Sequence, residues 1–171
     1  NSIEKSNIHA LALIESGIES VHFTLPTADI SVEKLLENID TTKVPIYFEP
    51  LFLSEKLVKG LQTFSLKNNS LFYILQDPIG HLSRSGNWHE NLKTDLHTLK
   101  QTINLGSDLR SVISIDLGLF QNTGGSIIQQ LAYTLAHANE YLNLIDSEKL
   151  KSVVFKVSVG SNYFFEIAKL Q

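Results

Sequence analysis

A short glycine loop followed by a helix pattern is the first stretch of this sequence that could carry chemistry. Gly124, Gly125 and Ser126 come directly before a run of apolar residues at helical spacing. Backbone N–H groups at the start of a helix bind phosphate readily, so the loop could hold a phosphorylated ligand. A serine in front of a helix also serves as its N-cap, and this explanation needs no ligand. We favour the cap, because two glycines and a serine form a weak motif.

The six histidines raise the question of a metal site. His81, His89 and His97 recur every eight residues, and no pair has the close spacing of zinc motifs. The sequence therefore predicts solvated surface histidines and no metal. A serine hydrolase needs a Gly-x-Ser-x-Gly elbow after a strand, which the loop at 124–126 does not supply. The absence of cysteine excludes thiolate chemistry and disulfides.

Composition excludes further classes of protein function. The 171 residues are 43% hydrophobic and 19% charged, as expected of one domain or of a piece cut from a larger protein. The net charge of -4, without clusters of Lys and Arg, argues against nucleic-acid binding. No apolar run approaches the roughly 20 residues of a membrane-spanning helix. We expect a cytoplasmic fragment that binds neither nucleic acid nor membrane.

Strand and helix patterns alternate along the chain and would position these residues. Period-two alternation predicts strands at 20–25, 44–49, 70–76, 111–117 and 152–159. Spacings of three and four predict helices at 3–16, 32–39, after Ser54, and at 89–103, 126–145 and 162–170, with a polar turn at 77–87 and a helical turn at 146–151. The helix at 126–145 is expected to be amphipathic through Ile127, Ile128, Leu131, Leu135, Ala138, Leu142 and Ile145. Such alternation predicts a parallel sheet.

The predicted strands have one apolar and one polar face. The apolar face carries Phe23, Leu25, Ile46, Phe48, Ile113, Ile115, Phe155 and Val157. The other face carries His22, Thr24, Tyr47, Glu49, Ser114, Asp116, Lys156 and Ser158. Strands of an open parallel sheet are usually apolar on both faces. Either the polar residues lie at strand ends in water, or the strands belong to a barrel with a polar interior, which is unusual.

Two stretches resemble signatures of the methylmalonyl-CoA mutase family. Residues 160–170, Gly-Ser-Asn-Tyr-Phe-Phe-Glu-Ile-Ala-Lys-Leu, are similar to a barrel strand that leads through Gly-x-Asn-aromatic-Phe into a helix reading Glu-apolar-Ala-Lys-Leu. The second stretch resembles a Ser-Ile-Ser strand, a Gln-x-x-Gly loop and an Ala-Tyr-Thr-Leu-Ala helix, at residues 111–116, 121–125 and 132–136. The resemblance is looser before Asp77.

The resemblance implies an α/β fold, namely a partial (β/α)₈ TIM-type barrel with parallel strands, in which residues 1–171 form a single domain of about five βα units. In that family the barrel admits a coenzyme A ester along its axis, so small and polar residues line its lumen. A separate domain binds adenosylcobalamin through an Asp-x-His-x-x-Gly motif, which does not occur here. Many bacterial members are heterodimers of a catalytic large subunit and a small subunit that neither binds cofactor nor turns over substrate.

Three departures from the family pattern favour the small subunit. In catalytic chains the strand matching 111–118 runs into Tyr-His, a tyrosine beside the substrate radical and a histidine that hydrogen-bonds the thioester carbonyl. The aligned positions are Gly118 and Leu119, and a third substrate contact, a glutamine, falls on Leu75. Leucine can neither donate a hydrogen bond nor move a proton. The resemblance thus implies no catalytic residue, no bound cofactor and no metal in this chain.

On the barrel interpretation, Glu49, Asp116 and Lys156 face the lumen. Charges taken out of water must be paired. We hypothesise that they help to fill the channel through which a catalytic homologue would pass coenzyme A. The hypothesis fails if Lys156 lies on the helix side of the sheet, or if an open tunnel runs along the barrel axis.

Three functions remain open at this point. The leading hypothesis is a barrel fragment of the small subunit, which is itself inactive and stabilises the large subunit of a mutase that interconverts methylmalonyl-CoA and succinyl-CoA in propionate metabolism. The first alternative is an active acyl-CoA mutase chain, in which another residue does the work of the histidine. The second is an unrelated α/β enzyme that binds a phosphorylated small molecule at Gly124-Gly125.

Overall fold

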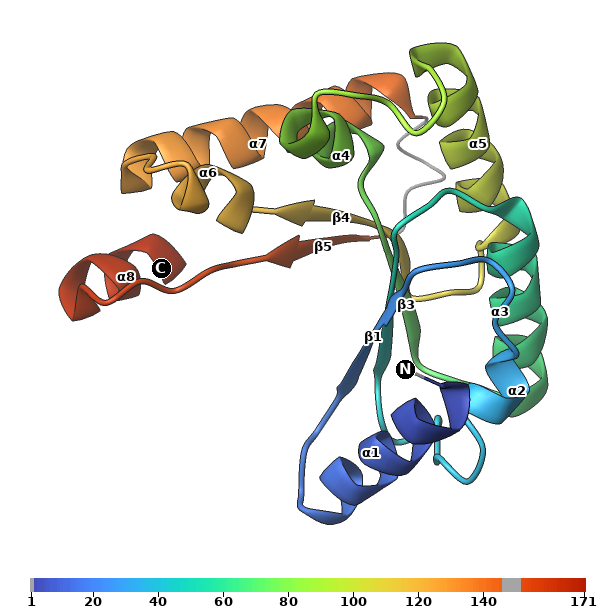
Figure 1. Cartoon of the computed structure of the whole chain (residues 1–171). Coiled ribbons are helices and arrows are strands. Elements are labelled where there is room, and N and C mark those ends of the chain that lie inside the picture. The colour runs from blue at the N-terminus through green and yellow to red at the C-terminus, as the bar shows by residue number, and fades with distance from the viewer. Residues whose placement is uncertain (1, 146–151) are drawn as a thin grey trace.

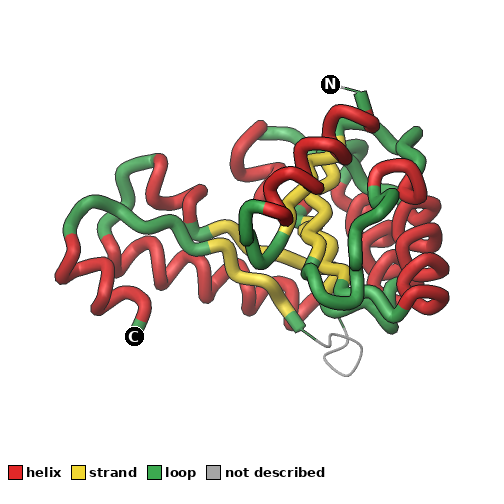
Figure 2. The backbone as a smooth tube through the Cα atoms, turned by 90° about the horizontal axis from the view of Figure 1, so that it is seen from below, coloured by secondary structure: helices red, strands yellow, loops and turns green. Residues whose placement is uncertain are grey.

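The computed structural model describes residues 2–145 and 152–171, and the five strands within them form one parallel sheet. The strands are β1 (Val21–Leu25), β2 (Ile46–Pro50), β3 (Phe72–Gln76), β4 (Ser111–Asp116) and β5 (Val153–Lys156). Their order in the sheet is β1-β2-β3-β4-β5. Figures 1 and 2 show the sheet and the helices around it from two directions. A doubly wound sheet reverses its strand order at a switch point, whereas consecutive parallel strands form the arc of a (β/α) barrel.

Helices connect the strands and cover one face of the sheet. They are α1 (Ile3–Glu15), α2 (Val32–Leu35), α3 (Glu55–Asn68), α4 (Pro78–Ser85), α5 (Leu92–Leu105), α6 (Gly118–Asn122), α7 (Ile127–Leu144) and α8 (Tyr163–Leu170). In Figure 1, α3, α5 and α7 follow one another around the outside of the curved sheet. None of the helices within residues 2–145 and 152–171 is long and apolar enough to cross a membrane.

The densest part of the core lies between β2, β3 and α3. Val58 and Leu61 of α3 and Phe48 of β2 are completely buried. The ring of Phe48 meets the ring of Phe72 edge to face, with 5.2 Å between the centroids. Ser54 caps α3, and Asn69 ends it in the left-handed conformation. The sequence predicted this helix and its apolar face correctly.

The segment between β3 and α5 differs from its predicted polar turn. It forms helix α4, in which Asp77 is the N-cap, Pro78 takes the first turn and Gly86 closes the helix with a φ of 75°. An aspartate followed by a proline favours the start of a helix, and here it does so although no apolar residues recur at helical spacing behind it. The short helix α6, which was also not predicted, comes directly before the glycine loop, and the helical turn predicted at 146–151 lies outside the described residues.

Three predicted elements are shorter or oriented differently in the structure. The strand predicted at 152–159 ends at Lys156, because its partner β4 ends at the paired Asp116. Helix 32–39 ends at Leu35. Helix α7 is present as predicted, but only part of its predicted apolar face is covered. Ile145 is buried and Ile127, Leu131 and Ala138 are half-buried, whereas Ile128, Leu135 and Leu142 are exposed. The helix also buries the polar side chains of Gln130, Thr134, His137 and Tyr141.

Candidate functional site

A chain of charged side chains crosses the face of the sheet opposite the helices. His22 Nε2 lies 3.0 Å from Glu49 Oε2, and Lys156 Nζ donates to Glu49 Oε1 at 2.8 Å. Lys156 also lies 3.8 Å from Asp116 Oδ2, which accepts a 3.3 Å hydrogen bond from Arg84 of α4. We call these five residues the lumen ion cluster. They come from β1, β2, β4, β5 and α4.

The Glu49–Lys156 contact shows how strongly the sheet curves. These residues belong to β2 and β5, which are separated by β3 and β4. Three strand spacings amount to about 14 Å along a flat sheet, so the side chains meet only because the sheet bends toward them. Lys156 therefore lies on the concave side, as the sequence predicted for Glu49, Asp116 and Lys156.

The lumen ion cluster strongly favours an ionised Glu49. The hydrogen bond from His22 lowers the pKa of Glu49 to about 2, and Lys156 acts in the same direction against the opposing effect of burial. Asp116 has a further partner, because its Oδ1 accepts the backbone N–H of Gly118 at 2.9 Å. The carboxylates are thus engaged by groups of the chain itself and do not present a free base to a ligand.

Two tyrosines occupy the same concave face beside the ion cluster. Tyr47 and Tyr73 are paired in the β2–β3 register, and their rings stack with 4.6 Å between centroids. Burial, followed by the neighbouring Tyr73, raises the pKa of Tyr47. A neutral aromatic pair and a network of ion pairs therefore occupy part of the concave face of the described strands.

A pocket of about 440 Å³ opens at the lumen ion cluster, at the C-terminal ends of β2, β3 and β4, and four members of the cluster line it, namely Glu49, Arg84, Asp116 and Lys156. Phe52, Leu75, His81 and His89 contribute to its wall. The rings of His81 and His89 stack with 3.8 Å between centroids, and desolvation lowers the pKa of His89. The prediction of solvated surface histidines is wrong for this pair, which is half-buried, and correct for His97. Within the described residues, no three metal-binding side chains gather.

A buried polar cluster at the end of β3 went unnoticed in the sequence. Asp77 Oδ1 accepts hydrogen bonds from Tyr141 Oη and from the Gly80 backbone N–H, both at 2.8 Å, and His137 Nε2 lies 3.0 Å away. Tyr141 Oη in turn accepts the backbone N–H of Ile79. Burial, followed by Asp77, raises the pKa of Tyr141. The only sequence signal was the spacing of four between His137 and Tyr141, which places both on one helix face.

The glycine loop is used for capping. Gln129 N–H donates to Ser126 Oγ, and Ser126 N–H donates to Gln129 Oε1, which together form a capping box. Gly124 has a φ of 83°, and a Cβ on Gly125 would lie 2.8 Å from the carbonyl oxygen of Phe120. Amide groups that could bind a phosphate are therefore engaged within the loop, and the cap is confirmed.

The profile of the methylmalonyl-CoA mutase family matches residues 31–171, which include the sheet from β2 onward and the concave-face residues of β2, β3, β4 and β5. This chain belongs to the methylmalonyl-CoA mutase family. A similar protein is the methylmalonyl-CoA mutase small subunit of Porphyromonas gingivalis, with 27% identity over 187 residues. The alignment covers all of this chain and 30% of that relative, so the chain spans about a third of the relative's length.

The three positions aligned with mutase substrate contacts are all occupied by the protein's own packing. A Cβ on Gly118 would lie 2.5 Å from Ser158 Oγ and 2.9 Å from Asp116 Oδ1, so a larger side chain there requires the side chains of Ser158 and Asp116 to shift. Leu119 is half-buried in α6, and Leu75 is buried at the wall of the pocket. Their loss of catalytic roles remains a prediction.

The mutase-like segment at residues 160–170 is held by a buried lysine. Lys169 of α8 has a completely buried side chain and donates to the carbonyl oxygen of Ser158 at 2.7 Å. It also donates to Gln121 of α6 at 3.1 Å and to Gln130 of α7 at 3.3 Å. Its hydrogen bond to Glu166 lowers the pKa of that carboxyl group. The Glu-apolar-Ala-Lys sequence thus joins α8 to α6 and α7 through polar contacts.

These residues do not fit adenosylcobalamin. The family's Asp-x-His-x-x-Gly motif is not found in the sequence, and the buried His137 lies against Asp77 inside the fold. Arg84 and Lys156 of the lumen ion cluster are paired with carboxylates. We therefore derive no chemical step through the cofactor.

Proposed function

We propose that the chain is part of the substrate-type barrel of a small mutase subunit, and that it is non-catalytic. In this proposal residues 1–171 are a single-domain fragment of that barrel, and the parent protein stabilises a large catalytic subunit in a cytoplasmic heterodimer. The large subunit would hold adenosylcobalamin and interconvert methylmalonyl-CoA and succinyl-CoA.

One observation carries this proposal. The concave face, along which the family admits an acyl-CoA ester, is spanned by the Glu49–Lys156 ion pair and partly occupied by the Tyr47–Tyr73 stack. A ligand moving along the face would have to separate these groups and leave charges without partners, which is costly in a protein interior. The name of the P. gingivalis relative supports the subunit assignment.

Family membership overturns the alternative of an unrelated α/β enzyme, and the capping box gives the glycine loop a structural role. An active acyl-CoA mutase chain remains the second candidate. The 440 Å³ pocket beside Leu75 favours it, because a small acyl group could be accommodated there.

An assay of isomerase activity on the full-length parent protein alone, on the large subunit alone and on the mixture distinguishes the two candidate functions. The proposal expects no isomerase activity and no acyl-CoA binding for the parent alone, and greater activity or thermal stability of the large subunit in the mixture. Turnover by the parent alone would establish the second candidate. The absence of any complex would refute the role as a partner.

A further inference from the structure

Two stacked histidines form part of one side of the pocket at the C-terminal ends of the strands. His81 belongs to α4, and His89 belongs to residues 86–91, which connect α4 to α5. Both line the pocket together with Arg84. Their rings are parallel to within 11°, and the stack joins the connection to α4.

Apart from this stack, the connection at 86–91 is held by groups that are near it in the sequence. Asp95 of α5 accepts the backbone N–H groups of His89 and of the residue after it, at 2.8 and 3.1 Å. Gly86 begins the connection with a φ of 75°. Among the described residues, every hydrogen bond of the connection goes to a partner within 82–95. The connection can therefore move without breaking a hydrogen bond to a distant part of the fold.

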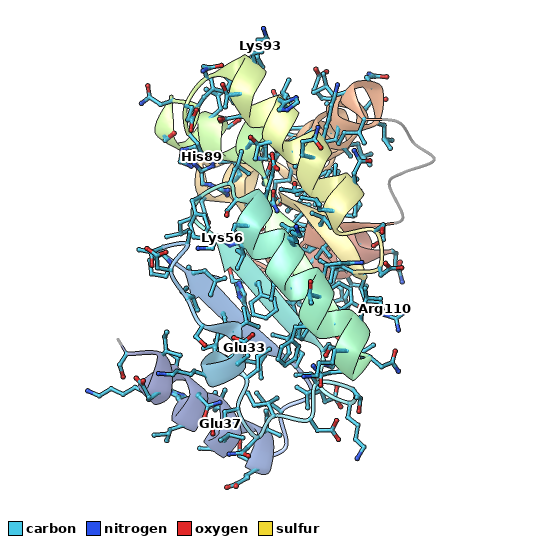
Figure 3. The ribbon with its side chains drawn as sticks, turned by 90° about the vertical axis from the view of Figure 1, so that its right-hand side faces the viewer. Glu33, Glu37, Lys56, His89, Lys93 and Arg110 are labelled. Carbon is cyan, nitrogen blue, oxygen red and sulfur yellow. The ribbon has the colours of Figure 1, made fainter. Side chains whose placement is uncertain are left out.

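Cationic groups lie near the histidine stack. Arg84 follows His81 by one turn of α4 and is bonded to Asp116. In the view of Figure 3, Lys56 of α3 lies below His89. The carboxylates nearby are engaged elsewhere, because Asp95 accepts backbone N–H groups and the other acidic and basic pocket residues, Glu49, Asp77, Asp116 and Lys156, have the partners described above. Within residues 2–145 and 152–171, no carboxylate forms an ion pair with either ring of the stack.

This arrangement distinguishes the stack from the other paired histidines. His22 and His137 each lie 3.0 Å from a carboxylate, so a proton taken up there gains an opposite charge. Protons on both rings of the stack place two like charges face to face. Burial, followed by His81, lowers the pKa of His89, and Asp95 opposes this effect. Acid therefore acts against the stack.

We propose that the His81–His89 stack is a proton-operated latch on the pocket. The stack holds while one ring is neutral; when both rings carry a proton, they separate and the connection moves away from α4 about Gly86. Two unit charges about 4 Å apart repel each other several times more strongly near a protein surface than in bulk water. Histidine is also the side chain whose charge ordinarily changes between about pH 5 and 8. The latch would act alike in a catalytic and in a non-catalytic chain, because it controls only access to the pocket.

The test labels the full-length parent protein with 5-fluorotryptophan and follows Trp88, the residue before His89, by ¹⁹F NMR between pH 8 and 5. The Trp88 resonance is assigned by its loss in Trp88→Phe. Its shift between H₂O and D₂O reports how far solvent reaches the ring, which is half-buried in the structure. We expect this solvent isotope shift to rise reversibly as the pH falls, with a midpoint below about 6.5.

Two variants and a control assign the response to the stack. His89→Phe keeps an aromatic ring that cannot take up a proton, so Trp88 should keep its pH 8 value throughout. The double variant His81→Lys, His89→Lys carries both charges at every pH tested and should give the acid value already at pH 8. His97→Phe, at an exposed position of α5, is the matched control and should respond as the wild type does.

A solvent isotope shift that stays constant from pH 8 to 5 would overturn the proposal, and so would equal responses of wild type and His89→Phe. A change in chemical shift without a change in the solvent isotope shift would show that charge alters near Trp88 while the connection stays in place, which also overturns it. Loss of far-ultraviolet circular dichroism over the same pH range would assign the response to general unfolding and overturn the latch as well.

Discussion

The N-terminal and C-terminal parts of the fold bury different kinds of surface. Between β1–β3 and α3 the buried faces are apolar, with Phe48, Leu61 and Ile74 completely enclosed. Along α7 and α8 the buried faces carry Gln130, His137, Tyr141, Glu166 and Lys169. Apolar contacts stabilise a fold roughly in proportion to the apolar area that they remove from water. Hydrogen bonds stabilise it only where donor and acceptor have the right distance and angle.

In α7 and α8, several large apolar residues point away from the core. Tyr163, Phe164 and Phe165 of α8 are exposed, as are Ile128, Leu135 and Leu142 of α7. Polar contacts such as those of Lys169 and Asp77 fix α7 and α8 in place and leave the apolar surface free for other chain segments. Apolar burial stabilises the N-terminal part, whereas a few hydrogen bonds and ion pairs hold α7 and α8 in position.

The strongest test of the comparison removes Phe48 from the N-terminal core. Phe48→Ala should lower the free energy of unfolding of the full-length parent by about 3–5 kcal/mol, because a cavity replaces a fully buried ring. Phe164→Ala is the control, since this ring on α8 is 80% exposed in the structure. Urea denaturation measures both. Similar losses for the two variants would mean that the C-terminal part also has an apolar core.

Asp77→Ala tests the polar interior. We expect a loss of about 3 kcal/mol in unfolding free energy, because Tyr141 Oη and the Gly80 N–H lose their acceptor and α4 loses its cap. Tyr141→Phe removes one hydroxyl group and should cost about 1–2 kcal/mol. A change below about 1 kcal/mol for Asp77→Ala would show that this cluster does not hold α7.

The pH dependence of stability tests the lumen ion cluster. The pKa of Glu49 is lowered from 4.5 to about 2, so the folded state favours its ionised form. Its contribution is present above about pH 4.5 and is lost as the pH falls toward 2. Because the group is partly exposed, Glu49→Gln should cost at most about 1 kcal/mol at pH 7. The difference between wild type and variant should vanish in acid, and a constant difference across the pH range would contradict the assignment.

The smallest effect is expected at Ile128, on the exposed side of α7. Ile128→Gln should change the unfolding free energy by no more than about 0.5 kcal/mol, since the side chain is already in water. The same substitution at Ile74, which is completely buried on β3, should be severely destabilising. Thermal melts of the parent without its partner compare the two. A large loss at Ile128 would place this side chain inside the parent's own fold.

The sequence predicted those features that depend on local periodicity. All five strands and helices such as α3 were identified, because alternation and helical spacing follow from burial of one face. Helix α4 escaped, since Asp77-Pro78 is a start signal without an apolar period behind it. The apolar face of α7 was only partly predicted, because periodicity locates apolar residues without saying which of them the fold covers, and Ile128, Leu135 and Leu142 are exposed.

The candidate site was predictable only as a set of residues on one face. Glu49, Asp116 and Lys156 were placed there from strand alternation. Their pairing depends on sheet curvature, which brings β2 and β5 together across two intervening strands. The contribution of Arg84 depends on α4, so an unpredicted helix concealed it. No local pattern contains that information.

Gly118 has an evolutionary consequence. If this position once held the family's tyrosine, reverting the glycine alone would drive a Cβ into Ser158 and Asp116. The larger side chain could return only if these two side chains shifted, and a shift of Asp116 would disturb its hydrogen bond to the backbone N–H of Gly118. On that history, two neighbouring side chains would have to adjust together with position 118, which makes the reversal slower than the loss.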